Sequence, residues 1–331
     1  RTERARRTRA LARRWRGQAE VGRARPGEAI PVLGWPVAFD PAGLSLRLLR
    51  SIDFPVERLV LVASGSAPHL PELLAAVRRL RADVQIIRLE SNLGCAGGWN
   101  EVIHVTPEAP WWLIASHDVA FPPGALARIA SQTEAALARE ERGWMPAPGL
   151  RSFAIRGQPS YANTLPAFVL TRRAVATAGL FDENFWPAYA EDHDYLHRLR
   201  LVGGARAGAA AVRDGTIEII HGPEDWGTAH YSGIEQFAWG PQQAAVDAEA
   251  SRAEVVEQLR AADNYHLHFC QKFGTLGRRN CSDMEYAATG PFGTAAAGWD
   301  DWILDPGRRA CIQQGGVLCA FDVRLLDASA A

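Results

Sequence analysis

The sequence predicts an α/β fold built on a mixed, mainly parallel sheet flanked by helices. From residue 29 to about residue 145, short apolar runs alternate with stretches whose apolar residues recur every three or four positions. Strands and helices that alternate in this way form parallel βαβ units. Glycine-rich or acidic segments follow several of the apolar runs, which is where such sheets bind ligands. The composition, 47% hydrophobic and 22% charged over 331 residues, is that of a globular chain with a large core.

The first predicted strand is the apolar run at residues 29–33. Asp40-Pro41 is a helix cap followed by a first-turn proline, and it predicts a helix that carries four leucines between residues 44 and 49. The run at 58–63 is apolar almost throughout, which is typical of a strand buried on both faces. A stripe of apolar residues over 70–80 then predicts an amphipathic helix.

Two further strand and helix pairs follow in the same order. Residues 84–89 predict a third strand, and residues 95–104 predict a short helix. Residues 111–115 form a fourth apolar run, and the helix after it begins near Pro122-Pro123. Its apolar residues are Leu126, Ile129 and Leu137, at helical spacing.

The alternation is less regular beyond residue 145. Strands are predicted at 152–155, 167–170 and 216–221, with a helix that begins near Glu191 between the last two. Ser251 and Glu254 form a capping box that opens a helix ending near Gly274, and the last 55 residues give little pattern. We therefore divide the chain into a basic arm (1–27), a core (28–225) and a helical and irregular extension (226–331).

Charge and composition exclude some classes of function. The formal net charge is −1, which argues against a nucleic-acid-binding protein, and no run of eighteen apolar residues could span a membrane. Residues 1–28 carry ten arginines and three acids, so this arm is either a solvated tail or a peripheral contact for a membrane surface. Cys311 and Cys319 bracket a turn and would form a disulfide in an oxidising compartment. With the sequon at Asn280, they favour a Golgi or secretory lumen; a bacterial protein would be cytoplasmic.

Polar segments follow the predicted strands. Ser64 follows the second strand, and the glycine-rich segment Ser91–Asn100 follows the third, where its backbone can approach a phosphate closely or simply open a helix. Asp118 follows the fourth strand and His221 ends the last one. Together they suit a metal ion, although an isolated Asp can also cap a helix and an isolated His is usually structural.

The stretch from Phe181 to Tyr195 contains five acids among several aromatic residues. One hypothesis is an aromatic-walled loop that brings Glu191 and Asp192 to the start of a helix. The helix dipole would keep such a carboxylate ionised, as a general base requires. The alternative is an ordinary acidic helix start, with Phe181, Phe185 and Trp186 in the core.

The order of these segments resembles the family-2 nucleotide-sugar glycosyltransferases, which have the GT-A fold. Asn92-x-Gly94-x-Ala96-Gly97-Gly98-x-Asn100 resembles the donor-binding loop of that family. His117-Asp118-Val119 stands where its metal motif stands, and His221 matches its late metal-binding histidine. Glu191-Asp192-x-Asp194 resembles its catalytic helix start. The matches run in order over more than half of the chain.

The resemblance implies an inverting transfer of a sugar from a nucleotide-diphosphate donor to a hydroxyl of a glycan or glycoconjugate. Asp118 and His221 would hold Mn²⁺ or Mg²⁺, Asp192 would be the general base with Glu191 beside it, and Trp186 and Tyr189 would stack on the acceptor. Asp194 is a further expected acceptor-binding residue. The expected donor-binding residues are Ser64, Asn92, Gly94, Gly97, Gly98, Asn100 and His117.

Two departures from the family pattern leave alternatives open. No acid stands near the end of the second strand, where the family reads the nucleotide base, and Ser116 replaces an acid of the metal motif. A glycosyltransferase-like binding protein without catalysis is therefore one alternative. A nucleotidyltransferase of similar architecture is another, although it would be expected to have a basic glycine-rich loop after the first strand, and Leu33–Pro36 has no basic residue.

Overall fold

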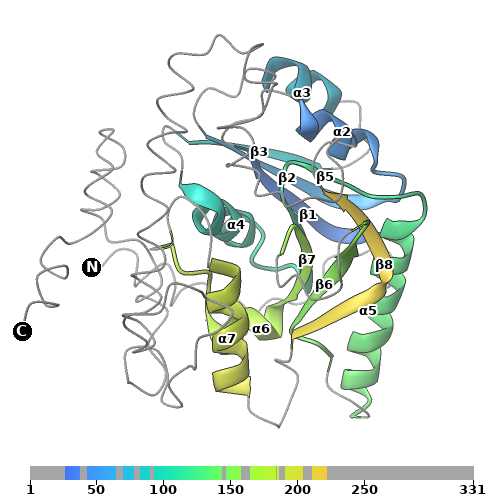
Figure 1. The fold of residues 1–331 in the computed structure, drawn as a ribbon, viewed down its shortest axis with the longest axis vertical. Helices are drawn as coiled ribbons and strands as arrows, with labels where there is room; N and C mark the ends of the chain where they lie inside the picture. Colours follow the sequence, from blue (N-terminus) through green and yellow to red (C-terminus); the bar gives the residue numbers. More distant parts are fainter. Residues whose placement is uncertain are drawn as a thin grey trace, which may run out of the picture.

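The computed structural model describes residues 27–37, 43–64, 70–77, 83–89, 93–143, 147–157, 165–183, 185, 191–203 and 211–221. Within them the chain forms an eight-stranded sheet with helices packed on both faces (Figure 1). The strands are β1 (Ile30–Val37), β2 (Val56–Ser64), β3 (Asp83–Leu89), β4 (Trp111–Ala115), β5 (Val119–Ala120), β6 (Leu150–Ile155), β7 (Ala167–Thr171) and β8 (Ala211–His221).

The strand order is β3-β2-β1-β4-β7-β6-β8-β5. The first four of these strands are parallel to one another. β7 is antiparallel to both β4 and β6, and β8 is parallel to β6. It follows that β4 and β8 run in the same direction and that their carboxyl ends lie at the same edge of the sheet. β5 closes this edge by pairing antiparallel with the end of β8.

Six helices are described: α2 (Leu44–Arg50), α3 (Leu70–Val77), α4 (Gly94–Val105), α5 (Ala125–Glu141), α6 (Arg172–Ala178) and α7 (Glu191–Gly203). Apolar side chains of the strands alternate between two core clusters, as the pleat of a strand requires. In β4, Trp111, Leu113 and Ala115 pack with α2, α3 and α5, whereas Trp112 and Ile114 pack with α4, α6 and α7. The sheet therefore lies between two layers of helices.

The mixed, mainly parallel α/β class predicted from the sequence is confirmed, and β4 has the predicted bounds. Several details differ. β1 extends to Val37, so Leu33–Pro36 lies within it and not after it. α2 begins at Leu44 with Gly43 at its N-cap position, and Asp40, the predicted cap, lies outside the described residues. α6 was not predicted; Thr171 caps it by accepting a hydrogen bond from the Ala174 amide. β8 begins five residues before the predicted start at 216, because it pairs with β6 across a register shift.

None of the helices in the described residues is long and apolar enough to cross a membrane. Residues 1–26 and 222–331 lie outside the described residues. They include nearly all of the basic arm, the helix predicted from Ser251 and the Cys311–Cys319 pair. The division into arm, core and extension stays a prediction.

Candidate active site

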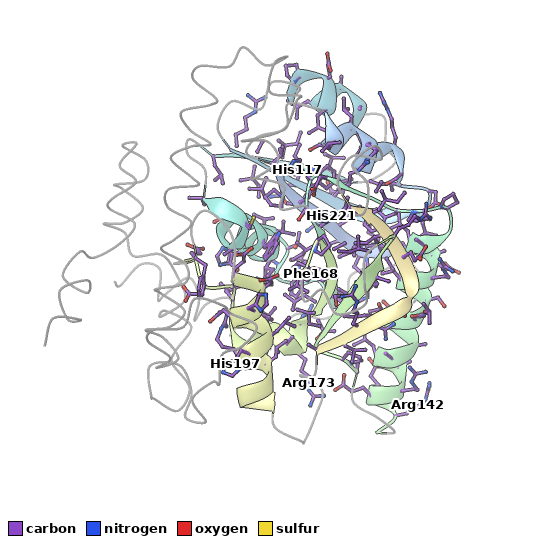
Figure 2. The ribbon with its side chains drawn as sticks, viewed as in Figure 1. His117, Arg142, Phe168, Arg173, His197 and His221 are labelled. Atoms are coloured by element: carbon purple, nitrogen blue, oxygen red, sulfur yellow. The ribbon has the colours of Figure 1, made fainter. Side chains whose placement is uncertain are left out.

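The carboxyl ends of β4 and β8 bring Asp118 and His221 together. Val119 of β5 pairs with His221 of β8, so the residue just before β5 lies beside the last residue of β8. The His221 Nε2 atom is 3.2 Å from Asp118 Oδ2. His117 lies at the same edge of the sheet (Figure 2). Its Nε2 atom is buried and has no hydrogen-bond partner among the described residues.

Asp118 and His221 stabilise each other in their charged forms. Burial alone would raise the pKa of Asp118, but the positive charges of His221 and His117 outweigh it and hold that pKa well below its usual range. Burial alone would lower the pKa of His221, but its contact with Asp118 raises it overall. The two pKa shifts have the directions expected for a buried ion pair.

The segment that carries Asp118 is fixed by α2 and the turn that follows it. Arg47 donates a hydrogen bond from its Nη2 atom to the Asp118 carbonyl oxygen at 2.6 Å. Ser51 Oγ accepts one from the Phe121 amide, and Asp53 accepts one from the Gly124 amide at 2.7 Å. Three side chains spaced along α2 and its exit therefore hold the turn between β4 and α5. None of them was singled out in the sequence, because a surface-helix arginine or serine carries no signal of its partner.

The glycines of α4 allow the helix to pack closely. A Cβ atom on Gly98 would lie 2.4 Å from Pro36 Cβ, and one on Gly97 would lie 2.7 Å from Leu93 Cβ. Gly94 is the first residue of the helix and has a φ of 73°. Pro36 is near the carboxyl end of β1, so the close contact at Gly98 holds the amino-terminal part of α4 against the sheet edge that carries Asp118. The structure thus gives Gly97 and Gly98 a packing role in addition to the predicted role in donor binding.

Asn100 was predicted to bind the donor, and that role stays a prediction. Its side chain is fully buried and bonds to the segment after α6. A carboxamide in an apolar helix face has to find a partner in the interior, and here the partner is a loop 81 residues away in the chain.

Glu191 and Asp192 occupy the first turn of α7 and are both largely buried. Asp192 Oδ1 accepts a hydrogen bond from the His193 amide at 2.7 Å. Burial raises the pKa of Asp192, although hydrogen bonds from nearby backbone amides and the His193 charge act against this rise. The dipole argument from the sequence predicted only stabilisation of the charged form. The structure adds a larger opposing effect, because desolvation disfavours a carboxylate.

Cys95 lies in the first turn of α4. Burial raises the pKa of its thiol. The negative charges of Glu191, Asp118 and Asp192 raise this pKa further, so all three carboxylates are within electrostatic reach of one sulfur atom. The sequence did not single out Cys95, which is a partly buried free cysteine.

Asp194 was predicted to contact the acceptor, and that role stays a prediction. Its carboxylate is fully buried and accepts a hydrogen bond from Arg198 Nε at 2.8 Å, one turn along α7. The spacing of four residues places both side chains on one face of the helix, which here is the inner face. Phe181 and Phe185 are also fully buried, so they belong to the core, as the alternative from the sequence proposed.

Three predicted residues, Asn92, Trp186 and Tyr189, lie outside the described residues. Ser64 is the last residue of β2, at the same sheet edge as the end of β1. Within the described residues no group of three or more His, Cys, Asp or Glu side chains could hold a metal ion. Asp118 and His221 fit a shared ion nevertheless, because two adjacent ligands at about 2.1 Å from an octahedral ion are about 3 Å apart.

No family model matches the chain. Among curated proteins, a galactofuranosyl glycosyltransferase of Leishmania donovani is 28% identical over 235 residues, covering 53% of this chain and 53% of the relative. The chain is similar to a glycosyltransferase. This finding confirms the resemblance drawn from the motifs. The chain spans about half the length of that relative.

Several solved structures are also similar. TarS of S. aureus (residues 1–349) is 16% identical with a TM-score of 0.44, covering 77% of this chain and 76% of TarS. Glucosyl-3-phosphoglycerate synthase of Mycobacterium tuberculosis, solved with Mg²⁺ and uridine diphosphate, is 14% identical with a TM-score of 0.40, covering 70% of this chain and 79% of the synthase. GalNAc-T7, solved with UDP, GalNAc and Mn²⁺, is 11% identical with a TM-score of 0.46, covering 73% of this chain and 50% of GalNAc-T7.

Proposed function

We propose that the protein is an inverting glycosyltransferase that moves a sugar from a nucleotide-diphosphate donor to a hydroxyl group of a glycan or glycoconjugate. The observation that supports this best is the placement of two carboxylates: Asp118 lies 3.2 Å from His221 at the strand ends, and Asp192 lies in the first turn of α7. One carboxylate belongs to a pair suited to a diphosphate-bound metal ion, and the other belongs to a helix start suited to a general base. The similarity to a galactofuranosyl glycosyltransferase makes galactofuranose the first donor sugar to test.

Asp118 and His221 would hold the divalent ion, Mn²⁺ or Mg²⁺. Two protein ligands suffice for such an ion, because substrate phosphates and water complete its coordination. When bound, the ion would supply positive charge to the leaving diphosphate. Arg47 keeps the Asp118 carbonyl fixed and so holds this ligand at the sheet edge. α4 begins with Gly94 and Cys95, and the dipole at the amino-terminal end of a helix favours an anion such as a phosphate.

The transfer is a single displacement. The acceptor hydroxyl oxygen forms a bond to the anomeric carbon while the bond from that carbon to the diphosphate oxygen breaks, and the electron pair leaves with the diphosphate. Asp192 takes the proton of the hydroxyl. Attack from the face opposite the leaving group inverts the anomeric configuration. A buried carboxylate with a raised pKa suits this task, because general bases work best when their pKa is near the working pH.

A donor screen tests the proposal. Purified protein would be incubated with nucleotide-linked sugars, beginning with UDP-galactofuranose, and with simple glycoside acceptors, in the presence of Mn²⁺, of Mg²⁺ or of EDTA. We expect transfer with one donor, in the inverted configuration, and loss of transfer in EDTA. A protein that binds a nucleotide sugar but transfers it to no acceptor would instead be a glycosyltransferase-like binding protein.

Variants of the proposed ligands test the metal role separately. Asp118→Asn and His221→Gln should each weaken Mn²⁺-dependent binding of UDP by at least about tenfold, the usual cost of disturbing a metal site. Asp83→Asn and His104→Gln are matched controls, because Asp83 pairs with Arg58 at an exposed site and His104 lies at the far end of α4. Calorimetric titration with UDP, with and without Mn²⁺, measures the effect. Equal affinities in all four variants would remove the metal role.

A further inference from the structure

Asn100 makes three hydrogen bonds from α4 to the segment after α6. Its Nδ2 atom donates to the Phe181 carbonyl oxygen at 2.9 Å and to Glu183 Oε1 at 3.2 Å. Its Oδ1 atom accepts a hydrogen bond from the Phe181 amide at 2.9 Å. The side chain is fully buried, so no water replaces these bonds. We call this set of bonds the Asn100 bridge.

The Asn100 bridge needs a carboxamide. The Phe181 backbone presents one donor and one acceptor to the interior, and only a side chain with both an acceptor oxygen and an N–H donor can satisfy both at once. Leaving a buried backbone group without a partner costs about 1–3 kcal/mol. Alanine at this position would leave two such groups, and aspartate would leave one and place its charge beside Glu183.

The same segment, residues 178–183, is held from its other side by α7. Arg198 donates to the carbonyl oxygens of Ala178 and Leu180, and Tyr195 donates to that of Gly179 at 3.0 Å. The Phe181 ring stacks on the Tyr195 ring, with ring centroids 4.2 Å apart. The 178–183 segment is therefore a buried connection between α4 and α7, bonded to both helices.

Both helices contact the Phe181 ring near their amino-terminal ends: the ring centroids lie 4.9 Å from Trp99 of α4 and 4.2 Å from Tyr195 of α7. Asn100 lies six residues beyond Gly94, which is about 9 Å along the helix. The Asn100 bridge and the α7 bonds to the same segment therefore link the two helices in their first halves.

We propose that Asn100 is a positioning residue: the Asn100 bridge sets Asp192 on α7 against the donor-binding end of α4. The inference rests on the proposed glycosyl transfer, and it is an alternative to the direct donor contact expected from the sequence. A misplacement of about 1 Å can lower a rate about a hundredfold, because catalysis depends on the position of the base more than donor binding does. Loss of the bridge should thus lower turnover and leave donor affinity nearly unchanged.

The test compares three variants. Asn100→Ala removes all three bonds, and Asn100→Asp keeps only the acceptor for the Phe181 amide. Thr106→Val is the matched control: it removes a buried hydrogen bond from Trp112 at the opposite end of α4 and leaves the bridge intact. Each variant would be tested for stability in urea, for Mn²⁺-dependent UDP affinity, and for kcat and KM of transfer per folded molecule.

We expect Asn100→Ala to lower kcat by about tenfold to a hundredfold, with the KM of the donor and the affinity for UDP within a factor of about three of the wild type. The kcat of Asn100→Asp should lie between those of Asn100→Ala and the wild type. If Asn100→Ala does not fold, Asn100→Asp takes its place in the comparison. Thr106→Val should keep the wild-type kcat at a comparable loss of stability. Equal kcat in the wild type and in the folded Asn100 variants would overturn the proposal.

A second readout does not depend on catalysis. If α7 moves away from α4, the carboxylates that raise the Cys95 pKa move too, and the thiol should be alkylated faster in Asn100→Ala than in Thr106→Val. Peptide mass spectrometry isolates this cysteine from the other four. Hydrogen exchange at the Phe181 amide should lose its protection in the same variant. An unchanged alkylation rate would overturn the positioning role even if the wild type transferred no sugar, whereas absence of transfer alone would count only against the proposed function.

Discussion

Asp192 is subject to two opposing influences at the residue scale. Its position in the first turn of α7 favours the carboxylate, and its burial disfavours it. The effect of burial is larger than the stabilisation of the charged form, so the pKa of Asp192 is raised. The position in the helix could be predicted from the sequence. The burial could not, because it depends on contacts with distant parts of the chain, such as the Leu165 backbone, which bonds to the carboxyl group.

This raised pKa predicts the pH dependence of transfer. A general base has to be ionised, so kcat/KM falls as the pH drops through the pKa of the free enzyme. An ordinary aspartate would place this fall near pH 4. We expect the fall in kcat/KM at a clearly higher pH. Asp192→Glu should change the pH at which kcat/KM falls, whereas Glu183→Gln should leave that pH unchanged. Initial rates measured between about pH 4 and pH 9 decide the matter, and a fall at or below about pH 4 would contradict the burial argument.

The proximity of Asp118 and His221 was predictable from one feature of the sequence. Asp118 and His221 each follow an apolar strand, and the parallel direction of β4 and β8 brings such positions together. Asn100 and Asp194 were assigned to ligands because they are polar and stand in recognised motifs. Both are bonded inside the protein, to Phe181 and to Arg198. A motif gives the identity of a residue but not the direction in which its side chain points.

At the element scale, the close contact of α4 with β1 is the feature most open to test. Pro36 has a rigid ring, so it cannot move away from a Cβ atom 2.4 Å from its own. Gly98→Ala should therefore destabilise the protein by about 1–3 kcal/mol, the usual cost of overpacking, even though alanine is the better helix former. Gly215→Ala is the control, because no atom lies within 4 Å of the added Cβ. Urea unfolding measures both, and a stabilising Gly98→Ala would contradict the packing.

The Asp194–Arg198 pair gives a second prediction at this scale. Both side chains are almost completely buried, and breaking such a pair leaves one charge without compensation, at a cost of about 3–5 kcal/mol. Asp194→Ala should lose stability of this order while its folded fraction keeps most of its affinity for UDP. The exposed Arg156–Glu218 pair is the comparison, and Glu218→Gln should change stability by about 1 kcal/mol or less. A raised KM for the acceptor with unchanged stability would instead support the acceptor contact predicted from the sequence.

Helices and strands could be predicted from the sequence where their apolar residues form a long and regular pattern. β4 is an uninterrupted apolar run and has the bounds predicted. α6 follows β7 without a break, and no helix was predicted over its seven residues. The first half of β8 contains arginine, aspartate and glycine, and only its pairing with β6 makes it a strand.

At the scale of the whole molecule, the strand and helix alternation predicted the parallel strands β1 to β4. It did not predict that β7 lies antiparallel beside β4, because an apolar run does not identify its partner strand. This insertion matters for function. β7 reverses the direction once and β6 reverses it again, which returns β8 to the direction of β4 and places His221 beside Asp118.

The proposed mechanism depends on one step. In this step Asp192 removes a proton from an acceptor hydroxyl next to a diphosphate that is bound at the end of β4. The most direct measurement is the turnover of Asp192→Asn with the donor and acceptor found in the screen, alongside its affinity for UDP with Mn²⁺. This variant keeps the shape of the side chain and removes its basicity. We expect turnover to fall by about two to four orders of magnitude, the usual contribution of a general base, with UDP affinity near that of the wild type. Turnover at the wild-type rate would contradict the account and make Glu191, the adjacent carboxylate in the same helical turn, the residue to test next.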